Sequence, residues 1–247
     1  MKFDYYKYFH ELTTDRTDGG RVQVPDDQAL WPPDWRQVHY KTYNFFKELV
    51  LPPARGDFFE RVSLRRSSSS TLLDKNNVSL DDLAYILKCG YGLRDGPDTT
   101  TGRLPSRTVP SAGARYPLEL YILQCTEQQA LPPGIYHYNV RTHALELVQS
   151  RTFTGSDQER MSPLPWFTKI HGLICISAVF NRTVGKYGTR GYRYVLLEAG
   201  HVGQNMLLAA AERDVVLVPV GGVEDGVLEQ YIGLDDSRER LVYCLSY

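Results

Sequence analysis

Alternating and continuous hydrophobic runs predict several β-strands in the second half of the chain. Residues 118–123 read LELYIL, and residues 134–148 hold two alternating runs joined by a polar turn, which predicts a strand followed by a hairpin. Residues 172–180 are almost continuously apolar, as expected of a strand covered on both faces. Residues 215–223 and 240–247 predict two further strands, separated by a short helix.

A helix is predicted directly after Ser79, which has the side chain of a good N-cap residue. Acidic side chains fill its first turn, apolar residues follow at helical spacing, and Gly90 or Gly92 supplies the stop. These signals predict a helix of about three turns between residues 79 and 92.

A longer helix is predicted over residues 192–214, where apolar side chains recur at i, i+4, i+7, i+11 and i+14. This is the stripe of a buried helix face. Gly200 and Gly203 interrupt it, at a cost of about 1 kcal/mol each relative to alanine. Either a ligand or another backbone comes close there, or the helix packs tightly on a neighbour.

Strands mixed with helices, including one hairpin, favour an α+β fold in which helices pack over a sheet. The first sixty residues are rich in aromatic, proline and charged residues and show little sustained periodicity. They predict an extension that wraps a core, with one helix near residues 39–50. We therefore divide the chain into an N-terminal extension, 1–60, and a folded domain, 61–247.

Composition and charge reduce the number of function classes that fit the chain. The hydrophobic content of 42% and the formal net charge of -1 are typical of a soluble globular protein and argue against binding to nucleic acid or anionic membrane. No apolar run approaches the roughly 18 residues that span a bilayer. The four cysteines lie far apart, form no C-x-x-C pair and follow no secretory signal, which favours reduced thiols in a cytoplasm.

The common catalytic motifs are absent. The chain has no G-x-G-x-x-G after a strand, no complete phosphate loop, no G-x-S-x-G and no H-E-x-x-H. Glu198, His201 and Asn205 form a polar stripe at i, i+3 and i+7. We interpret them as solvated or bonded across an interface, with no metal, because no second cluster has ligand spacing.

Four stretches remain as candidates for a site. Three carry glycine or arginine at the edges of predicted elements: RRSSSS from 65, PSAGARYPLELYIL from 110 and VPVGGV from 218. Each alone is also compatible with an ordinary loop, turn or strand end. The fourth, KYGTRGYRY over 186–194, crowds one lysine, three tyrosines, two arginines and two glycines in front of the long helix.

Together and in this order, these pieces resemble the SagB-type dehydrogenases, which are FMN-dependent azoline oxidases of the nitroreductase-like flavoprotein superfamily. The resemblance covers about residues 60 to 247 well and the extension loosely. The matching stretches are YFHELTT (8–14), RRS (65–67), LDDLAYILKCGYG (80–92), RTVPSAGARYPLELYIL (107–123), KYGTRGYRYVLLEAGHVGQN (186–205) and PVGGV (219–223) followed by LEQYIGL (228–234).

The resemblance implies a central antiparallel sheet flanked by helices, in an intertwined homodimer with FMN at the subunit interface. Members oxidise thiazoline or oxazoline rings, made from Cys, Ser or Thr of a ribosomal peptide, to thiazoles or oxazoles, and dioxygen reoxidises the flavin. Such oxidases often work in a complex with a YcaO-type cyclodehydratase. The N-terminal extension would be either a docking surface for partners or a strap over the dimer.

The resemblance also assigns cofactor-binding residues. Arginine and serine side chains would hold the FMN phosphate through charge-assisted hydrogen bonds. Glycines would let backbone approach the flavin ring, and two amide N–H groups would lie near N5. Two departures stand out, since Ser69 replaces a basic residue of the family pattern and nothing basic follows Arg240. The assigned residues are Arg65, Arg66 and Ser67 for the phosphate, Pro110, Ser111, Ala112 and Gly113 along the ring, and Gly221 and Gly222 near N5.

Lys186 and Tyr187 match the catalytic Lys-Tyr pair of the family. Aromatising an azoline removes two electrons and two protons, so a base is needed beside the ring. An unperturbed lysine, with a pKa of about 10.4, is a poor base at pH 7. Burial or neighbouring arginines would have to favour the free amine, or Lys186 would have to make Tyr187 more acidic. We expect one of the two to face the substrate and the other to orient it; the alternative is an exposed lysine and a packed tyrosine without a catalytic role.

Two other functions stay open at this point. The first is an NAD(P)H-dependent reductase of nitro compounds or quinones, as in much of the wider superfamily. The second is a flavin-free scaffold within a biosynthetic complex. Flavin bleaching by NAD(P)H would favour the first, and a failure to bind FMN would favour the second.

Overall fold

The computed structural model describes residues 5–13, 27–33, 53, 77–94, 106–127, 131–235 and 238–247. The expected helix near residues 39–50 lies outside these residues. The same holds for the expected phosphate-binding residues Arg65, Arg66 and Ser67. The candidate site therefore rests on segments from residue 77 onward, together with the helix at residues 5–13.

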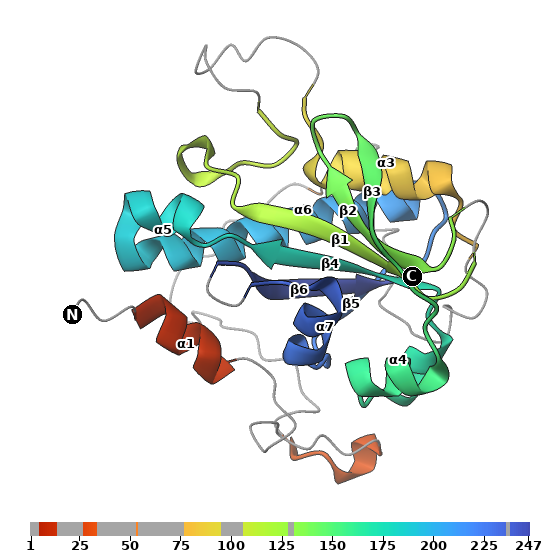
Figure 1. Cartoon of the computed structure of the whole chain (residues 1–247). Helices are drawn as coiled ribbons and strands as arrows, with labels where there is room; N and C mark the ends of the chain where they lie inside the picture. The colour runs from red at the N-terminus through yellow and green to blue at the C-terminus, as the bar shows by residue number, and fades with distance from the viewer. Residues whose placement is uncertain are drawn as a thin grey trace.

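The centre of the fold is a six-stranded sheet in the order β3-β2-β1-β4-β6-β5 (Figure 1). Every neighbouring pair is antiparallel, which confirms the expected α+β fold with a central antiparallel sheet. All the strands predicted from hydrophobic pattern are present. They are β1 (Leu118–Gln124), β2 (Gly134–Asn139), β3 (Ala144–Ser150), β4 (Gly172–Ala178), β5 (Val218–Val220) and β6 (Arg240–Ser246).

Helices cover both faces of the sheet (Figure 1). Helices α3 (Leu80–Tyr91) and α6 (Gly191–Glu212) share one buried cluster with inward residues of β1 such as Leu120. Helices α4 (Gly155–Met161) and α7 (Asp225–Ile232) share a second cluster with the opposite side chains, such as Leu123. Because both faces are covered, all seven residues of β4 are buried, as its continuous apolar sequence predicts.

The two predicted helices form where their sequence signals place them. At the start of α3, the Ser79 hydroxyl accepts from the Asp82 amide and the Asp82 carboxylate accepts from the Ser79 amide, which completes a capping box. The helix ends at Gly92. In α6, a Cβ at Gly203 would lie 2.4 Å from the Tyr243 ring, so tight packing explains this glycine, whereas a Cβ at Gly200 would meet nothing within 4 Å.

Several short helices were not predicted. Helix α4 begins with a second capping box at Thr154, and its sequence was not recognised because one amphipathic turn gives little periodicity. Helix α1 (Tyr5–Thr13) lies within the extension that the sequence indicated to be irregular. The remaining short elements are η1 (Gln28–Leu30), η4 (Ala112–Ala114), η5 (Pro165–Lys169), α5 (Asn181–Tyr187) and η6 (Gly188–Arg190). Among the described residues, no helix is both long and apolar enough to cross a membrane.

Candidate functional site

The segment in front of the long helix is helical. Lys186 and Tyr187 are the last residues of α5, which follows β4 after a short connection. Gly188 then turns the chain with φ +60°, and one turn, η6, leads into α6. The Lys-Tyr pair is thus placed between two helices, at the end of a central strand.

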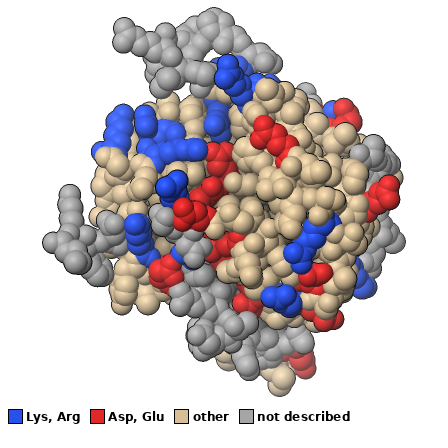
Figure 2. All heavy atoms as spheres, viewed as in Figure 1, with Lys and Arg blue, Asp and Glu red and all other residues tan. Residues whose placement is uncertain are grey.

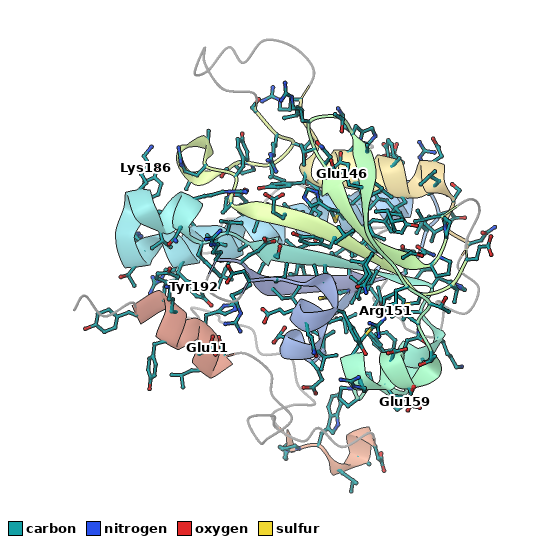
Figure 3. All side chains as sticks on the ribbon, viewed as in Figure 1. Glu11, Glu146, Arg151, Glu159, Lys186 and Tyr192 are labelled. Atoms are coloured by element: carbon teal, nitrogen blue, oxygen red, sulfur yellow. The ribbon has the colours of Figure 1, made fainter. Side chains whose placement is uncertain are left out.

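Gly113 lies directly against this pair. A Cβ at Gly113 would lie 2.4 Å from the Tyr187 hydroxyl oxygen and 2.7 Å from Lys186 Nζ. The backbone of Gly113 has φ +60°, which L side chains rarely adopt. Lys186 is at the end of α5, beside the η4 turn (Figure 3). The structure therefore brings two sequence-predicted parts of the site, 110–113 and 186–187, into contact.

The functional atoms of Lys186 and Tyr187 lie close to each other. Both approach the same position beside Gly113, and Lys186 Nζ lies 5.4 Å from the centre of the Tyr187 ring. The reason is local, because α5 ends at Tyr187 and the backbone there has φ −112° and ψ 5°. The end of the helix lets the ring turn back beside the lysine.

Tyr187 is half-buried, while Lys186 is exposed. The Tyr187 ring packs edge-to-face on Tyr194, with ring centres 5.4 Å apart, and the Tyr194 hydroxyl accepts a 3.0 Å hydrogen bond from Arg190 Nε. These contacts hold the phenol in place.

A buried carboxylate from α6 lies beneath the 107–116 loop. Glu198 is only 3% exposed and accepts a 2.9 Å hydrogen bond from the Tyr91 hydroxyl, which itself accepts from the Leu118 amide at 3.1 Å. Burial raises the pKa of Glu198, while hydrogen bonds from Ser111 and Tyr91 and the charge of Arg107 oppose that rise. The sequence analysis placed Glu198 in a polar stripe that was solvated or bonded across an interface; the structure instead buries it against a neighbouring helix of the same chain.

The loop above Glu198 adopts a strained conformation. Ala114 and Tyr116 have φ of +51° and +45°, uncommon for residues with a side chain. The Ser111 hydroxyl accepts from the Tyr116 amide at 2.9 Å, and the Tyr116 hydroxyl accepts from the Arg107 amide at 3.1 Å. These bonds stabilise the turn that presents Gly113 to the Lys-Tyr pair.

Arg107 completes this network from the opposite side. Its guanidinium lies 4.1 Å from the centre of the Tyr91 ring and 5.0 Å from that of Tyr116. Its Nη1 atom is buried and has no hydrogen-bond partner within the part of the chain that the structure describes. An unpaired buried donor is energetically unfavourable. The negative charge of the nearby Glu198 carboxylate offsets this cost.

We predict that Glu198→Leu destabilises the protein by about 3 kcal/mol, because it leaves the Tyr91 hydroxyl and the Arg107 charge uncompensated. Glu198→Gln keeps an oxygen that accepts from Tyr91 and should cost about 1 kcal/mol. Urea denaturation followed by circular dichroism measures both. A Glu198→Leu protein as stable as the wild type would show that the carboxylate does not support the loop.

Gly221 and Gly222 follow β5 at the other edge of the sheet. The Gly222 carbonyl accepts a 2.5 Å hydrogen bond from the Ser162 hydroxyl, whereas neither glycine amide has an acceptor in the described part of the chain. A Cβ at Gly221 would meet nothing within 4 Å. Two open amide donors on a rigid strand end fit the expected contact with flavin N5.

The two glycine segments are not neighbours within one chain. Residues 110–113 lead into β1, Gly221 and Gly222 follow β5, and strands β4 and β6 lie between them. Three strand spacings separate β1 from β5, which is about 14 Å. Each segment fits its expected role, but one chain does not place them together.

Helix α1 packs beside the base of the site. The Tyr6 hydroxyl donates to Asn181 Oδ1 at 3.2 Å, and His10 Nδ1 lies 3.3 Å from the Tyr192 hydroxyl oxygen. Glu11 forms an ion pair with Arg240. Burial, aided by the Arg240 charge, lowers the pKa of His10 to about 4, so the imidazole is neutral at pH 7. The extension thus supports the N-terminal ends of both helices that carry the candidate site.

Comparison with known proteins identifies relatives over most of the chain. The nitroreductase family model matches residues 63–247. MJ1384 of Methanocaldococcus jannaschii, named as a nitroreductase, is 30% identical over 190 residues, which cover 76% of this chain and 91% of that protein. The trifolitoxin-processing protein TfxB of Rhizobium leguminosarum bv. trifolii is 32% identical over 239 residues, 95% of this chain and 64% of TfxB.

The microcin B17-processing protein McbC of Escherichia coli is 30% identical over 181 residues, 69% of this chain and 62% of McbC. This chain therefore spans a little under two thirds of the lengths of TfxB and McbC. Among solved structures, a chain of the E. coli microcin synthetase McbBCD complex with truncated pro-MccB17 bound has a TM-score of 0.74 at 21% identity. That match covers 98% of this chain and 90% of the other, and it shows the shared fold.

Proposed function

Because this chain belongs to the nitroreductase family, we propose that it is an FMN-dependent azoline oxidase. Its reaction is the dehydrogenation of thiazoline or oxazoline rings of a ribosomal peptide to thiazoles or oxazoles. The observation that carries the proposal is the meeting of Lys186 Nζ and Tyr187 Oη at Gly113. The similarity to TfxB and McbC, both named as processing proteins of peptide natural products, supports a peptide substrate.

The residues present fit an FMN cofactor. Gly113 leaves open the space in which a Cβ would collide with the Lys-Tyr pair, and the amides of Gly221 and Gly222 have no acceptor among the described residues. Arg65, Arg66 and Ser67 would hold the phosphate, and residues 110–113 would line the ring. When bound, FMN would supply the two-electron acceptor for the dehydrogenation, with dioxygen as the final oxidant.

The chain's own contribution is to position the ring and remove a proton. The Tyr187 hydroxyl and the Lys186 amine face one point. One of the two accepts the proton, and the other keeps this base in its reactive form. The Tyr194 ring and Arg190 keep the phenol from rotating away. The Glu198 network keeps the 110–116 turn against the pair.

The active form is proposed to be a homodimer. One chain keeps residues 110–113 apart from Gly221 and Gly222, and a second copy would bring one segment of each kind together. Helix α6 has an exposed apolar face on which Leu196 and Leu197 are 39% and 61% exposed, next to the open Gly200. A glycine inside a helix that meets nothing in its own chain is well suited to the close approach of a second helix.

The same proposal includes the protein partners of this chain and its subcellular location. The McbBCD complex holds its chains together with a bound propeptide, which supports assembly of this chain with a YcaO-type cyclodehydratase. The four cysteines are free thiols, in keeping with a reducing cytoplasm. The extension is either a strap over the dimer or a docking surface.

The decisive experiment is the visible spectrum of the purified chain before and after anaerobic addition of an azoline-containing peptide. We expect a yellow protein that the peptide bleaches, with one azole formed per flavin reduced. NAD(P)H should bleach it far more slowly. Rapid reduction by NAD(P)H and none by the peptide would instead establish a reductase, the activity for which MJ1384 is named. A colourless protein that does not take up FMN would favour a scaffold.

A further inference from the structure

A group of cationic side chains, the cationic rim, surrounds the Lys-Tyr pair. Residues 106–118 and 179–197, which meet at Gly113, contain six lysine or arginine side chains and no carboxylate. Figure 2 shows lysine and arginine gathered over the part of the surface where α5 and η4 lie. The whole chain has a formal net charge of -1, so this local excess is balanced elsewhere. The six are Arg107, Arg115, Arg182, Lys186, Arg190 and Arg193.

Two of these six cations already interact with groups of the same chain. Arg107 is packed on the Tyr91 and Tyr116 rings above Glu198, and Arg182 pairs with Glu119 at 2.6 Å. The other four, Arg115, Lys186, Arg190 and Arg193, are exposed and have no carboxylate partner among the described residues. Four arginines elsewhere, at positions 151, 213, 238 and 240, do pair with acids. Arg141 and Arg160 are also exposed and have no carboxylate partner among the described residues, so what distinguishes the rim is the grouping of such cations around one point.

The arginines without a carboxylate partner lie on both sides of the pair. On one side, Arg115 follows Gly113 by two residues and donates from Nε to the Arg182 carbonyl at 3.0 Å, which fixes its stem along α5. On the other side, Arg190 is bonded to Tyr194, which packs on Tyr187, and Arg193 lies one turn further on. Both ends of a bound peptide would therefore pass an unpaired guanidinium.

We propose that this rim binds carboxylates of the peptide substrate on either side of the ring to be oxidised, so that the enzyme prefers azolines with acidic flanking residues. The inference rests on the proposed function. FMN phosphate has the same oxyanion chemistry, but one phosphate uses one or two cations at one place. Three arginines from three separate segments, Arg115, Arg190 and Arg193, lie on both sides of the pair and match an extended ligand with several carboxylates.

The test uses the full-length FMN-loaded protein and three azoline peptides that differ only in their flanking residues, two Glu, two Gln or two Lys. We expect KM to be lowest for the Glu peptide and highest for the Lys peptide, with kcat within twofold. The difference should shrink between 50 mM and 500 mM salt, because exposed charges are screened. Equal KM values for the three peptides would overturn the inference.

The variant for this test is Arg115→Gln/Arg193→Gln, because neither side chain touches Lys186 or Tyr187. We expect its KM for the Glu peptide to rise roughly fivefold to tenfold and its KM for the Gln peptide to stay unchanged. The matched control is Arg141→Gln/Arg160→Gln, which removes two exposed arginines from the β2–β3 turn and α4. A control variant that raised KM equally would point to net charge and overturn the assignment to the rim.

Two further readouts separate this inference from its premises. Affinity for FMN, titrated on the apoprotein, should be equal in wild type and Arg115→Gln/Arg193→Gln; a weaker FMN affinity with unchanged peptide KM would assign the rim to the phosphate and overturn the proposal. Binding of the same peptides carrying a neutral dye, measured by anisotropy, does not require turnover. A protein that binds the Glu peptide preferentially but oxidises none of the three would contradict the proposed function. It would still support the binding of peptide carboxylates by the rim.

Discussion

Lys186→Ala and Tyr187→Phe each yield a yellow protein whose turnover of an azoline peptide falls at least about 100-fold, the usual effect of losing a positioned acid–base group. The pair meets at Gly113, where the Tyr187 hydroxyl and the Lys186 amine are the nearest side-chain groups. FMN absorbance of the purified variants shows retained cofactor, and stopped-flow reduction under anaerobic conditions measures the chemical step.

A matched control for the tyrosine is Tyr194→Phe. It keeps the ring that packs on Tyr187 and removes only the hydroxyl that bonds Arg190, so its rate should stay within about fivefold of wild type. If Lys186→Ala and Tyr187→Phe both reduced flavin at the wild-type rate, the assignment of the base would be wrong.

Chemical rescue distinguishes the roles within the pair. If the Lys186 amine takes the proton, added methylamine should restore the rate of Lys186→Ala in proportion to its concentration. If the lysine only assists the Tyr187 phenol as the base, the added amine should restore little of the rate. The structure places both atoms equally well, so this measurement decides between them.

We expect Leu197→Glu to convert the proposed homodimer to a monomer and to abolish FMN binding. Leu197 is 61% exposed in the middle of α6, beside Leu196 and the open Gly200, and burying a carboxylate in an apolar interface is strongly unfavourable. Loss of the partner would separate residues 110–113 from the glycine amides after β5. Analytical ultracentrifugation and flavin absorbance measure the two effects.

The control is Leu147→Glu, which places the same charge on a leucine that is 56% exposed on the edge strand β3. It should remain dimeric and yellow. A Leu197→Glu protein that stayed dimeric with bound FMN would move the interface to another surface. A wild-type protein that bound FMN tightly as a monomer would remove the need for a second copy.

Much of the framework follows from short-range signals. The Ser79 capping box joins residues three apart, the β2–β3 hairpin is encoded by alternation around a polar turn, and β4 is encoded by an unbroken apolar run. Helix α4 escaped prediction because seven residues are too few to establish a period, although its own capping box at Thr154 was a usable signal. Helix α1 was missed because it is short and its helical form depends on packing against α5 and α6.

Some features of the candidate site are likewise visible in the sequence, and others are visible only in the structure. A glycine at 113 and a Lys-Tyr pair at 186–187 are visible in the sequence, and the family resemblance attaches roles to them. Their contact is not visible, because it depends on how β1 and β4 pair and on where α5 ends. The helical period placed Glu198 outside the apolar stripe but did not reveal that a neighbouring helix, carrying Tyr91, covers it.

By itself the sequence determined which segments become strands and helices, because caps, alternation and apolar runs act between residues a few positions apart. Only the tertiary structure decided that Lys186 and Tyr187 turn to the same point and that Glu198 is buried beneath the Gly113 loop. It also decided that three arginines around the site have no carboxylate partner among the described residues. The physical reason is that burial and charge pairing depend on residues distant in the chain, which come together only when the sheet and its helices pack.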